Sequence, residues 1–232
     1  MKKILLIVSL IAFCSLTGNA QERTFNFGLK IGPNLAWASS PSEEAGKSLG
    51  SRMGFSAGVF VDSYFTEHFA FSTGLNFNVL SMKYQFTDHR IVPNFVEATN
   101  IMVERKFSGT YLEVPLQLKM SFDVADAVSI FAGAGAGLGL NLSDKADDQY
   151  GFLGTESSYD NEFTNVTDDY RRLQFALKFN VGAAYRLNNY FSVFGQLAFH
   201  HSFSNMFVQQ KKKETGVNLK ANYIGLEFGI MH

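Results

Sequence analysis

The sequence predicts an all-β fold: an eight-stranded antiparallel transmembrane β-barrel of the outer-membrane type, wound as an up-and-down meander. Three observations predict it. Eight segments alternate apolar and polar residues with period two, short and long connections alternate between them, and an export signal precedes them. The composition agrees, because 24 Phe and 20 Gly among 232 residues favour strands with crowded faces.

Composition and charge also exclude some classes of protein. Hydrophobic residues make up 46% of the chain and charged residues only 18%, which excludes disorder for most of its length. The formal net charge of −1 excludes a globally basic nucleic-acid binder. We therefore expect no nucleic-acid partner.

The first twenty residues have the three parts of a secretory signal peptide. Lys2 and Lys3 precede an apolar run at 4–13, and Gly18 and Ala20 place small residues at the −3 and −1 positions of a cleavage site. The apolar run is too short for a transmembrane helix, which needs ~20 residues. We expect cleavage after Ala20.

Cleavage there leaves a barrel domain at 21–232. A lipoprotein anchored through Cys14 is an alternative that Phe13 disfavours, because a lipobox has a small residue at that position. The domain at 21–232 contains no cysteine, which excludes disulfides, a thiol nucleophile and zinc thiolates. It also contains no stretch of ~18 apolar residues that would predict a membrane-spanning helix.

Eight segments carry the period-two pattern, and each has one apolar face and one polar or glycine face. Most are about ten residues long, whereas the strands of soluble sandwiches average nearer five or six. A soluble sandwich or a lipocalin-like barrel is the competing fold, and the long strands disfavour it. The segments are 24–32, 55–62, 69–79, 112–120, 128–140, 173–182, 191–200 and 224–230.

The connections alternate in length. Short turns are expected at 63–68, 122–126 and 186–189, and longer loops at 37–52, 85–108, 142–170 and 204–217. Short turns at one end and long loops at the other are typical of outer-membrane barrels, and an even strand count then puts both termini in the periplasm. Ten strands remain an alternative if the loop at 142–170 extends a hairpin.

Isolated charges lie on the polar faces, three of each sign. Because buried charges must be paired, this balance predicts a narrow interior closed by ion pairs. Eight strands leave just enough room for side chains to fill the interior, so we expect no open pore. The predicted interior charges are Lys30, Asp62, Glu113, Lys119, Lys178 and Glu227.

Three strands resemble those of a known family. Residues 27–35 read FGLKIGPNL, residues 111–119 read YLEVPLQLK, and residues 131–137 read FAGAGAG. These are similar to the signature strands of the PorT-like outer-membrane β-barrel family of Bacteroidota. The resemblance covers essentially all of 21–232 and implies a barrel in the outer membrane. Its founding member belongs to the type IX secretion machinery, which makes an accessory role in type IX secretion an expectation.

The insertion signal of the family is less clear in this chain. Outer-membrane chains often end on an aromatic residue that the barrel-assembly machinery reads, whereas here Phe228 is followed by residues 229–232. We expect the barrel-assembly machinery as a partner during insertion, with Phe228 as the candidate signal.

The glycine run at 133–139 is a structural feature and not a phosphate loop. Its spacing is GxGxGxG, no Gly-Lys-Ser/Thr follows, and no helix is expected behind it. Period two places the four glycines on one strand face. We expect them to make room for large side chains from the opposite wall, such as Phe60, Phe131 or Phe194.

The best candidates for catalysis are His200 and Ser202, which share one strand face and could form a base–nucleophile pair. An acidic group should orient the histidine. Glu227 shares the inward face, but it lies near the opposite end of the barrel, which at a rise of ~3.4 Å per strand residue is too far from His200. We therefore expect no enzymatic activity. The five histidines are scattered and suggest no metal site, and no cofactor is expected.

Two long loops carry opposite charge. The acidic loop at 142–170 and a lysine triplet in the loop at 204–217 are expected to be solvated and partly paired with one another. Contact with lipopolysaccharide, divalent cations or a partner protein is the functional alternative. The exposed-loop candidates are Asp144, Asp147, Asp148, Asp168, Asp169, Lys211, Lys212 and Lys213.

These observations predict a monomeric barrel that acts as an envelope structural or interaction protein. Its expected surroundings are outer-membrane lipid and lipopolysaccharide, with envelope or secretion-system proteins as candidate partners. A narrow channel or small-ligand transporter is the first alternative. A lipid-modifying enzyme that uses His200 and Ser202 is the second.

Overall fold

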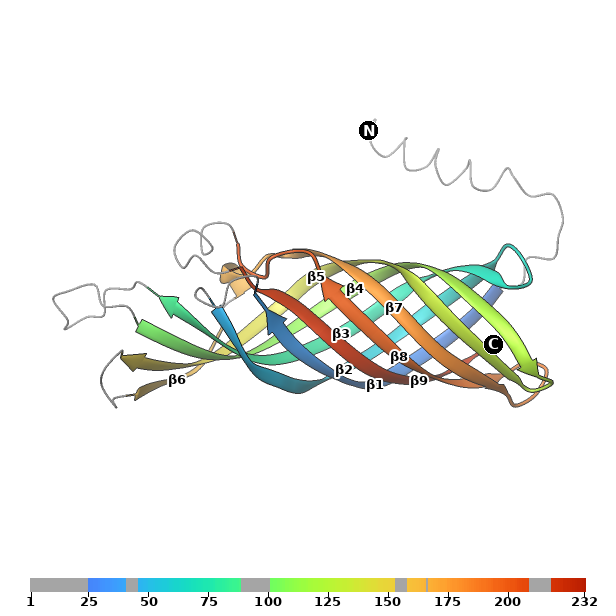
Figure 1. Cartoon of the computed structure of the whole chain (residues 1–232), viewed down its shortest axis with the longest axis horizontal. Coiled ribbons are helices and arrows are strands. Elements are labelled where there is room, and N and C mark those ends of the chain that lie inside the picture. Colours follow the sequence, from blue (N-terminus) through green and yellow to red (C-terminus); the bar gives the residue numbers. More distant parts are fainter. Residues whose placement is uncertain (1–24, 41–45, 89–100, 153–157, 166, 209–217) are drawn as a thin grey trace, which may run out of the picture.

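The computed structural model describes residues 25–40, 46–88, 101–152, 158–165, 167–208 and 218–232 (Figure 1). The predicted signal peptide at 1–20 lies outside these residues. The described part contains nine strands and one turn of 3-10 helix. They are β1 (Phe25–Ser39), β2 (Gly46–Tyr64), β3 (Phe69–Asp88), β4 (Ile101–Ala125), β5 (Val128–Phe152), β6 (Ser158–Asn165), η1 (Thr167–Asp169), β7 (Leu173–Arg186), β8 (Ser192–Ser202) and β9 (Lys220–Met231).

Eight of these strands form a closed antiparallel ring. The order is β1-β2-β3-β4-β5-β7-β8-β9, and β9 pairs again with β1. The eight-stranded barrel predicted from the sequence is therefore confirmed. The strand β6 pairs only with the far part of β5 and adds nothing to the ring, so the hairpin at 142–170 exists without making ten strands.

One end of the barrel, here called the turn end, carries three short turns at 65–68, 126–127 and 187–191. Side chains fix two of them. The hydroxyl of Thr66 accepts hydrogen bonds from the backbone N–H groups of His68 and Phe69, and the Asn188 side chain accepts from those of Tyr190 and Phe191. These turns lie where the sequence predicts them. Both strand termini of the described chain, the start of β1 and the end of β9, also lie at this end (Figure 1).

The outer surface next to the turn end is an apolar belt. Along β1, Phe27, Leu29 and Ile31 are 59%, 58% and 54% exposed. The outward side chains of β4 from Leu112 to Phe122 are apolar. The outward side chains of β5 from Ile130 to Leu142 are apolar as well. An outward apolar face over a polar inner face is the pattern of a lipid-facing barrel. Among the described residues, no helix is long and apolar enough to cross a membrane.

The strands β3, β4 and β5 continue past the belt as a long sheet at the opposite end, here called the extended end (Figure 1). Much of the predicted loops at 85–108 and 142–170 is therefore strand. The outward side chains of this sheet are mostly polar and form cross-strand ion pairs, Lys83 with Glu104 at 2.7 Å and Lys106 with Asp147 at 3.3 Å. Its inward side chains are largely apolar, among them Met82, Tyr84, Phe86, Val103 and Phe107. This is the arrangement of a water-soluble sheet.

A β-bulge in β5 marks the boundary between the two patterns. Tyr111 pairs with Asn141 and Thr110 pairs with Ser143, which leaves Leu142 as the extra residue. A bulge shifts the side-chain alternation by one residue. Beyond it, Asp144, Ala146 and Asp148 therefore face the interior, whereas uninterrupted period two would turn them outward.

Candidate functional site

Side chains fill the barrel interior in three layers. The layer nearest the turn end is aromatic. Phe194 lies edge-on to Phe60, with ring centroids 5.5 Å apart, and edge-on to Phe131, with centroids 6.0 Å apart. Ala184 and Met231 pack against this group. Edge-to-face contacts at these distances are favourable, so the three rings form a cohesive plug.

Glycines in the adjacent strands, each the register partner of one phenylalanine, make room for these rings. A Cβ at Gly28 would lie 2.3 Å from the Phe60 ring, and one at Gly182 or Gly229 would lie 2.6 Å from Phe131 or Phe194. The sequence-based pairing of these rings with the glycines at 133–139 was therefore wrong. The glycines at 133–139 face polar groups from neighbouring strands, such as Asn180 beside Gly133. The phenylalanines lie nearer the turn end than the glycine run does.

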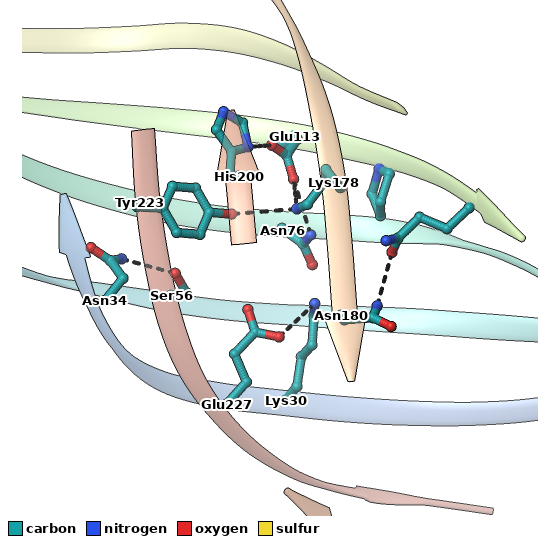
Figure 2. A network of polar contacts seen from close by, with 12 residues as sticks. Lys30, Asn34, Ser56, Asn76, Glu113, Lys178, Asn180, His200, Tyr223 and Glu227 are labelled. Atoms are coloured by element: carbon teal, nitrogen blue, oxygen red, sulfur yellow. Dashed lines mark hydrogen bonds and ion pairs between the residues drawn. The ribbon is translucent and has the colours of Figure 1, made fainter. Parts of the chain in front are cut away.

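The middle layer is polar and ionic (Figure 2). The six predicted interior charges form three ion pairs, two within this layer and one, between Lys119 and Asp62, beside the aromatic layer. Lys119 lies 2.6 Å from Asp62, Lys30 lies 2.9 Å from Glu227, and Lys178 bonds to Glu113. Amide side chains donate to the same carboxylate oxygens as the lysines, Gln196 to Oε2 of Glu227 and Asn76 to Oε1 of Glu113. Each buried charge therefore has a partner of opposite sign, as low-dielectric surroundings require.

His200 lies in the middle layer, beside an acid that the sequence did not suggest. Its Nδ1 is 3.1 Å from Oε2 of Glu113, and its ring stacks on Tyr223 with centroids 4.6 Å apart (Figure 2). Parity places Glu113 inward, but only the three-dimensional arrangement of the strands brings it opposite His200. The sequence argument considered only Glu227, which it judged too far from His200, and did not consider Glu113.

Ser202 does not complete a catalytic arrangement. Its hydroxyl is buried and donates to the backbone oxygen of Ser204 at 3.2 Å. In the described structure no hydrogen bond joins Ser202 to His200, although they lie two residues apart on one face. Glu113 is also engaged by Lys178, so the contact with His200 belongs to a structural network.

The third layer, here called the cap, closes the extended end. It contains Tyr84 and Phe107 from the long strands, Tyr170 from the residue after η1, and Phe207 from the segment after β8. The ring centroids of Phe107 and Tyr170 are 4.6 Å apart, and those of Tyr170 and Phe207 are 5.1 Å apart. Backbone hydrogen bonds tie the two segments together, from Arg171 to Met206 at 2.7 Å and from Val208 to Asp169 at 3.0 Å. Two segments predicted as open loops thus fold into the barrel.

A buried arginine anchors the cap. Arg105 donates through Nε and Nη2 to the two carboxylate oxygens of Asp148, both at 2.6 Å, and through Nη1 to the Tyr170 hydroxyl at 3.2 Å. The Tyr170 hydroxyl also bonds to that of Tyr84, and the Arg105 guanidinium lies 5.2 Å from the Phe86 ring centroid. Burial raises the pKa of Tyr170 to about 12, so this phenol stays protonated at neutral pH. Sequence analysis did not single out Arg105 or Tyr170.

The predicted exposed-loop residues have different positions in the structure. Asp144 and Asp148 are 0% and 4% exposed, so their expected exposure was wrong, because the bulge at Leu142 turns both inward. Asp147 points outward and pairs with Lys106. Asp168 is exposed, and Asp169 lies 4.0 Å from Arg105. Lys211, Lys212 and Lys213 lie outside the described residues.

Little space remains between the middle layer and the cap. Asn78, Tyr111, Gln174 and His200 line a cavity of about 10 Å³, which is room for one water molecule. Among the described residues, no group of three or more histidines and carboxylates gathers as a metal site.

Taken together, the ring, the belt and the three filled layers define a small transmembrane β-barrel with a packed interior. The family model of the outer membrane protein beta-barrel domain matches residues 19–208, and the chain belongs to that family. Membership places the protein in the outer membrane. A comparison with curated proteins finds no match.

Solved structures of outer-membrane barrels are similar over most of their length. Neisserial surface protein A is 15% identical, with 88% of this chain and 95% of that one covered and a TM-score of 0.40. The outer membrane protein OprG from Pseudomonas aeruginosa is 11% identical, with 90% and 95% covered and a TM-score of 0.40. The outer membrane protease OmpT from Escherichia coli is 7% identical, with 93% and 99% covered and a TM-score of 0.37.

Proposed function

We propose that this protein is an envelope structural or interaction protein whose barrel is closed and whose extended end makes its contacts. The observation that carries the proposal is the packed interior. Aromatic side chains fill both ends, and paired charges fill the middle. A barrel filled in this way leaves the surfaces outside the membrane as the places where it can act.

The orientation follows from the unequal ends. Outer-membrane barrels have short periplasmic turns and longer extracellular segments. On that basis, the extended end is extracellular, and the turn end with both strand termini is periplasmic. The outward ion pairs Lys83–Glu104 and Lys106–Asp147 then lie on a water-facing surface outside the cell.

The two alternatives from the sequence have less support. A channel needs a continuous path, whereas the cavity between the middle layer and the cap holds about one water molecule. A lipid-modifying enzyme needs a nucleophile that substrate can reach, whereas Ser202 is buried and bonded to the backbone. Neither is favoured.

The narrower role, an accessory of type IX secretion, rests on the PorT-like resemblance alone and stays a prediction. A pull-down tests both the general interaction role and this narrower role. The protein, tagged after Ala20, is purified from its native outer membrane in mild detergent, and every co-purifying chain is identified. Stoichiometric recovery of another envelope protein supports the interaction role, and recovery of secretion-system components supports the narrower one.

A matched pair of variants makes the pull-down sharper. Charge reversal at two outward positions of the extended sheet, K83E and K106E, should release a partner that binds this surface. The same reversal at Arg186 in the turn end, R186E, should not. Recovery of the barrel alone, at any detergent strength that keeps it folded, would contradict the interaction role.

A further inference from the structure

The turn end of the barrel opens into a polar cavity of about 580 Å³, here called the cup. The turns 65–68 and 187–191 form its rim, and inward residues of β1, β4, β5 and β8 form its wall. Sites for small molecules in proteins have volumes of about 300–1,000 Å³. The cup therefore has the size of a ligand site.

The floor of the cup closes it off from the rest of the barrel. Phe131 and Lys119 form this floor. The Lys119 ammonium lies 2.6 Å from Asp62, 4.4 Å from the Phe131 ring centroid and 5.5 Å from that of Phe60. Beside it, Oδ1 of Asp62 is buried and has no hydrogen-bond partner among the described residues. The floor thus offers the Lys119 ammonium as a donor, whereas its counter-charge, Asp62, is fully buried and does not line the cup.

The wall of the cup consists of small groups that both donate and accept hydrogen bonds. Ser121, Ser129 and Ser192 come from three different strands, and Asn26 comes from a fourth. A hydroxyl carries one donor and two acceptor positions, and an amide carries both kinds of group. Such a wall matches a ligand whose own groups also donate and accept.

Lys119 and Arg186 each have an acidic neighbour, and Glu67 adds a further acid to the lining of the cup, which disfavours an anionic ligand. Lys119 is neutralised by Asp62, and the Arg186 guanidinium lies 4.0 Å from Asp123. At the rim, Tyr190 is an exposed aromatic side chain, 67% accessible. Sugar rings combine hydroxyl edges, which donate and accept, with C–H faces that pack on aromatic rings.

The geometry points to a binding site for a neutral carbohydrate of one or two sugar rings in the cup. A sugar hydroxyl at the floor can accept a hydrogen bond from Lys119 and donate one to a wall hydroxyl such as that of Ser121 or Ser129. The inference rests on the proposed orientation only for the side of access: if the turn end is periplasmic, the carbohydrate arrives from the periplasm.

The test uses residues 21–232 in lipid nanodiscs, prepared without sugar-based detergents. N,N′-diacetylchitobiose, a neutral disaccharide, is titrated and followed by backbone amide NMR shifts. We expect saturable binding with shifts at Ser121, Ser129 and Ser192. Ser129→Leu fills the cup and should weaken binding at least 10-fold. Ser63→Leu, which adds the same side chain on the outer surface of the same end, should leave binding unchanged.

A second cup-filling variant, Ser192→Leu, replaces Ser129→Leu if the latter does not fold. Absence of saturable binding to the unmodified protein would overturn the inference, as would equal binding by the cup variants and Ser63→Leu. Saturable binding of acetate or spermidine in place of the disaccharide would overturn the carbohydrate assignment. None of these results bears on whether the barrel conducts ions, so this site and the closed-barrel proposal fail independently.

Discussion

Arg105 and Asp148 face each other across β4 and β5 and form a two-bond ion pair inside the extended end, where the outer surface is no longer apolar. The two residues are register partners, 43 positions apart in the chain. Through Tyr170, the pair also holds the segment after η1 in the barrel. The cap is therefore built on one buried charge pair.

Replacing Arg105 should loosen the cap. Arg105→Met leaves the Asp148 carboxylate buried without its guanidinium, a change that typically costs about 3–5 kcal/mol. We expect faster proteolysis at 167–172 and 205–208 and a lower urea midpoint in micelles. Lys106→Met, next in sequence but facing outward, removes a half-exposed ion pair and should cost about 0–1 kcal/mol. Equal effects of the two variants would show that the cap does not depend on Arg105.

Removing both charges should restore much of the loss. The double variant R105M/D148L replaces the pair by apolar side chains of similar size, and such replacements are often neutral or stabilising. Its urea midpoint should therefore lie well above that of R105M. If the double variant is as unstable as R105M, the bond to Tyr170 rather than the charge pair supports the cap.

Glu113 should be the most sensitive charge of the middle layer. It contacts Lys178, His200 and Asn76, so Glu113→Gln leaves the Lys178 ammonium buried without a counter-charge. We expect a loss of about 3–5 kcal/mol, seen as a lower temperature for the loss of the compact gel form on heating in SDS. Glu104→Gln on the outer surface is the control and should cost about 0–1 kcal/mol. A small effect at Glu113 would show that the interior is hydrated.

Gly28 should tolerate no side chain while Phe60 is present. A Cβ there would lie 2.3 Å from the ring, so Gly28→Ala should destabilise the barrel by about 1–3 kcal/mol through overpacking. Phe60→Leu should recover part of this loss in the double variant. Gly139→Ala, where the nearest atom is 3.6 Å away, serves as the control. If the loss persists unchanged in the double variant, the nearby backbone oxygen of Ile230 is the obstacle.

Cysteine labelling tests the orientation. The domain at 21–232 has no cysteine, so single variants report one position each. Lys83→Cys in the extended end should react with a membrane-impermeant maleimide on intact cells. Asn189→Cys in the turn end should react only after the outer membrane is permeabilised. The reverse pattern would mean that the extended end is periplasmic.

The sequence predicts the part of the barrel within the belt well. Lipid outside and paired charges inside leave a regular alternation, and the short turns at Thr66 and Asn188 are local features. The period-two alternation alone predicts the eight strands and the inward orientation of Lys30 and Glu227. No contact between distant parts of the chain is needed for this prediction.

The extended end was harder to predict because its pattern is inverted. On β3, the apolar residues face outward up to Val79 and inward from Leu80 onward, and the alternation itself continues through Phe86. That change of face was a signal in the sequence, and it marks where the lipid belt ends. The bulge at Leu142 and the contact of Arg105 with Tyr170 depend on register and loop closure, which period two does not encode.

The packed interior is the central claim, and ion conductance tests it most directly. The purified protein, residues 21–232, is inserted into planar lipid bilayers in 1 M KCl and recorded at single-channel resolution. We predict no stable conductance steps, because aromatic layers close both ends and ion pairs fill the middle. Reproducible conductance steps of porin size, seen with the folded protein and absent when unfolded protein is added in its place, would contradict the packed interior.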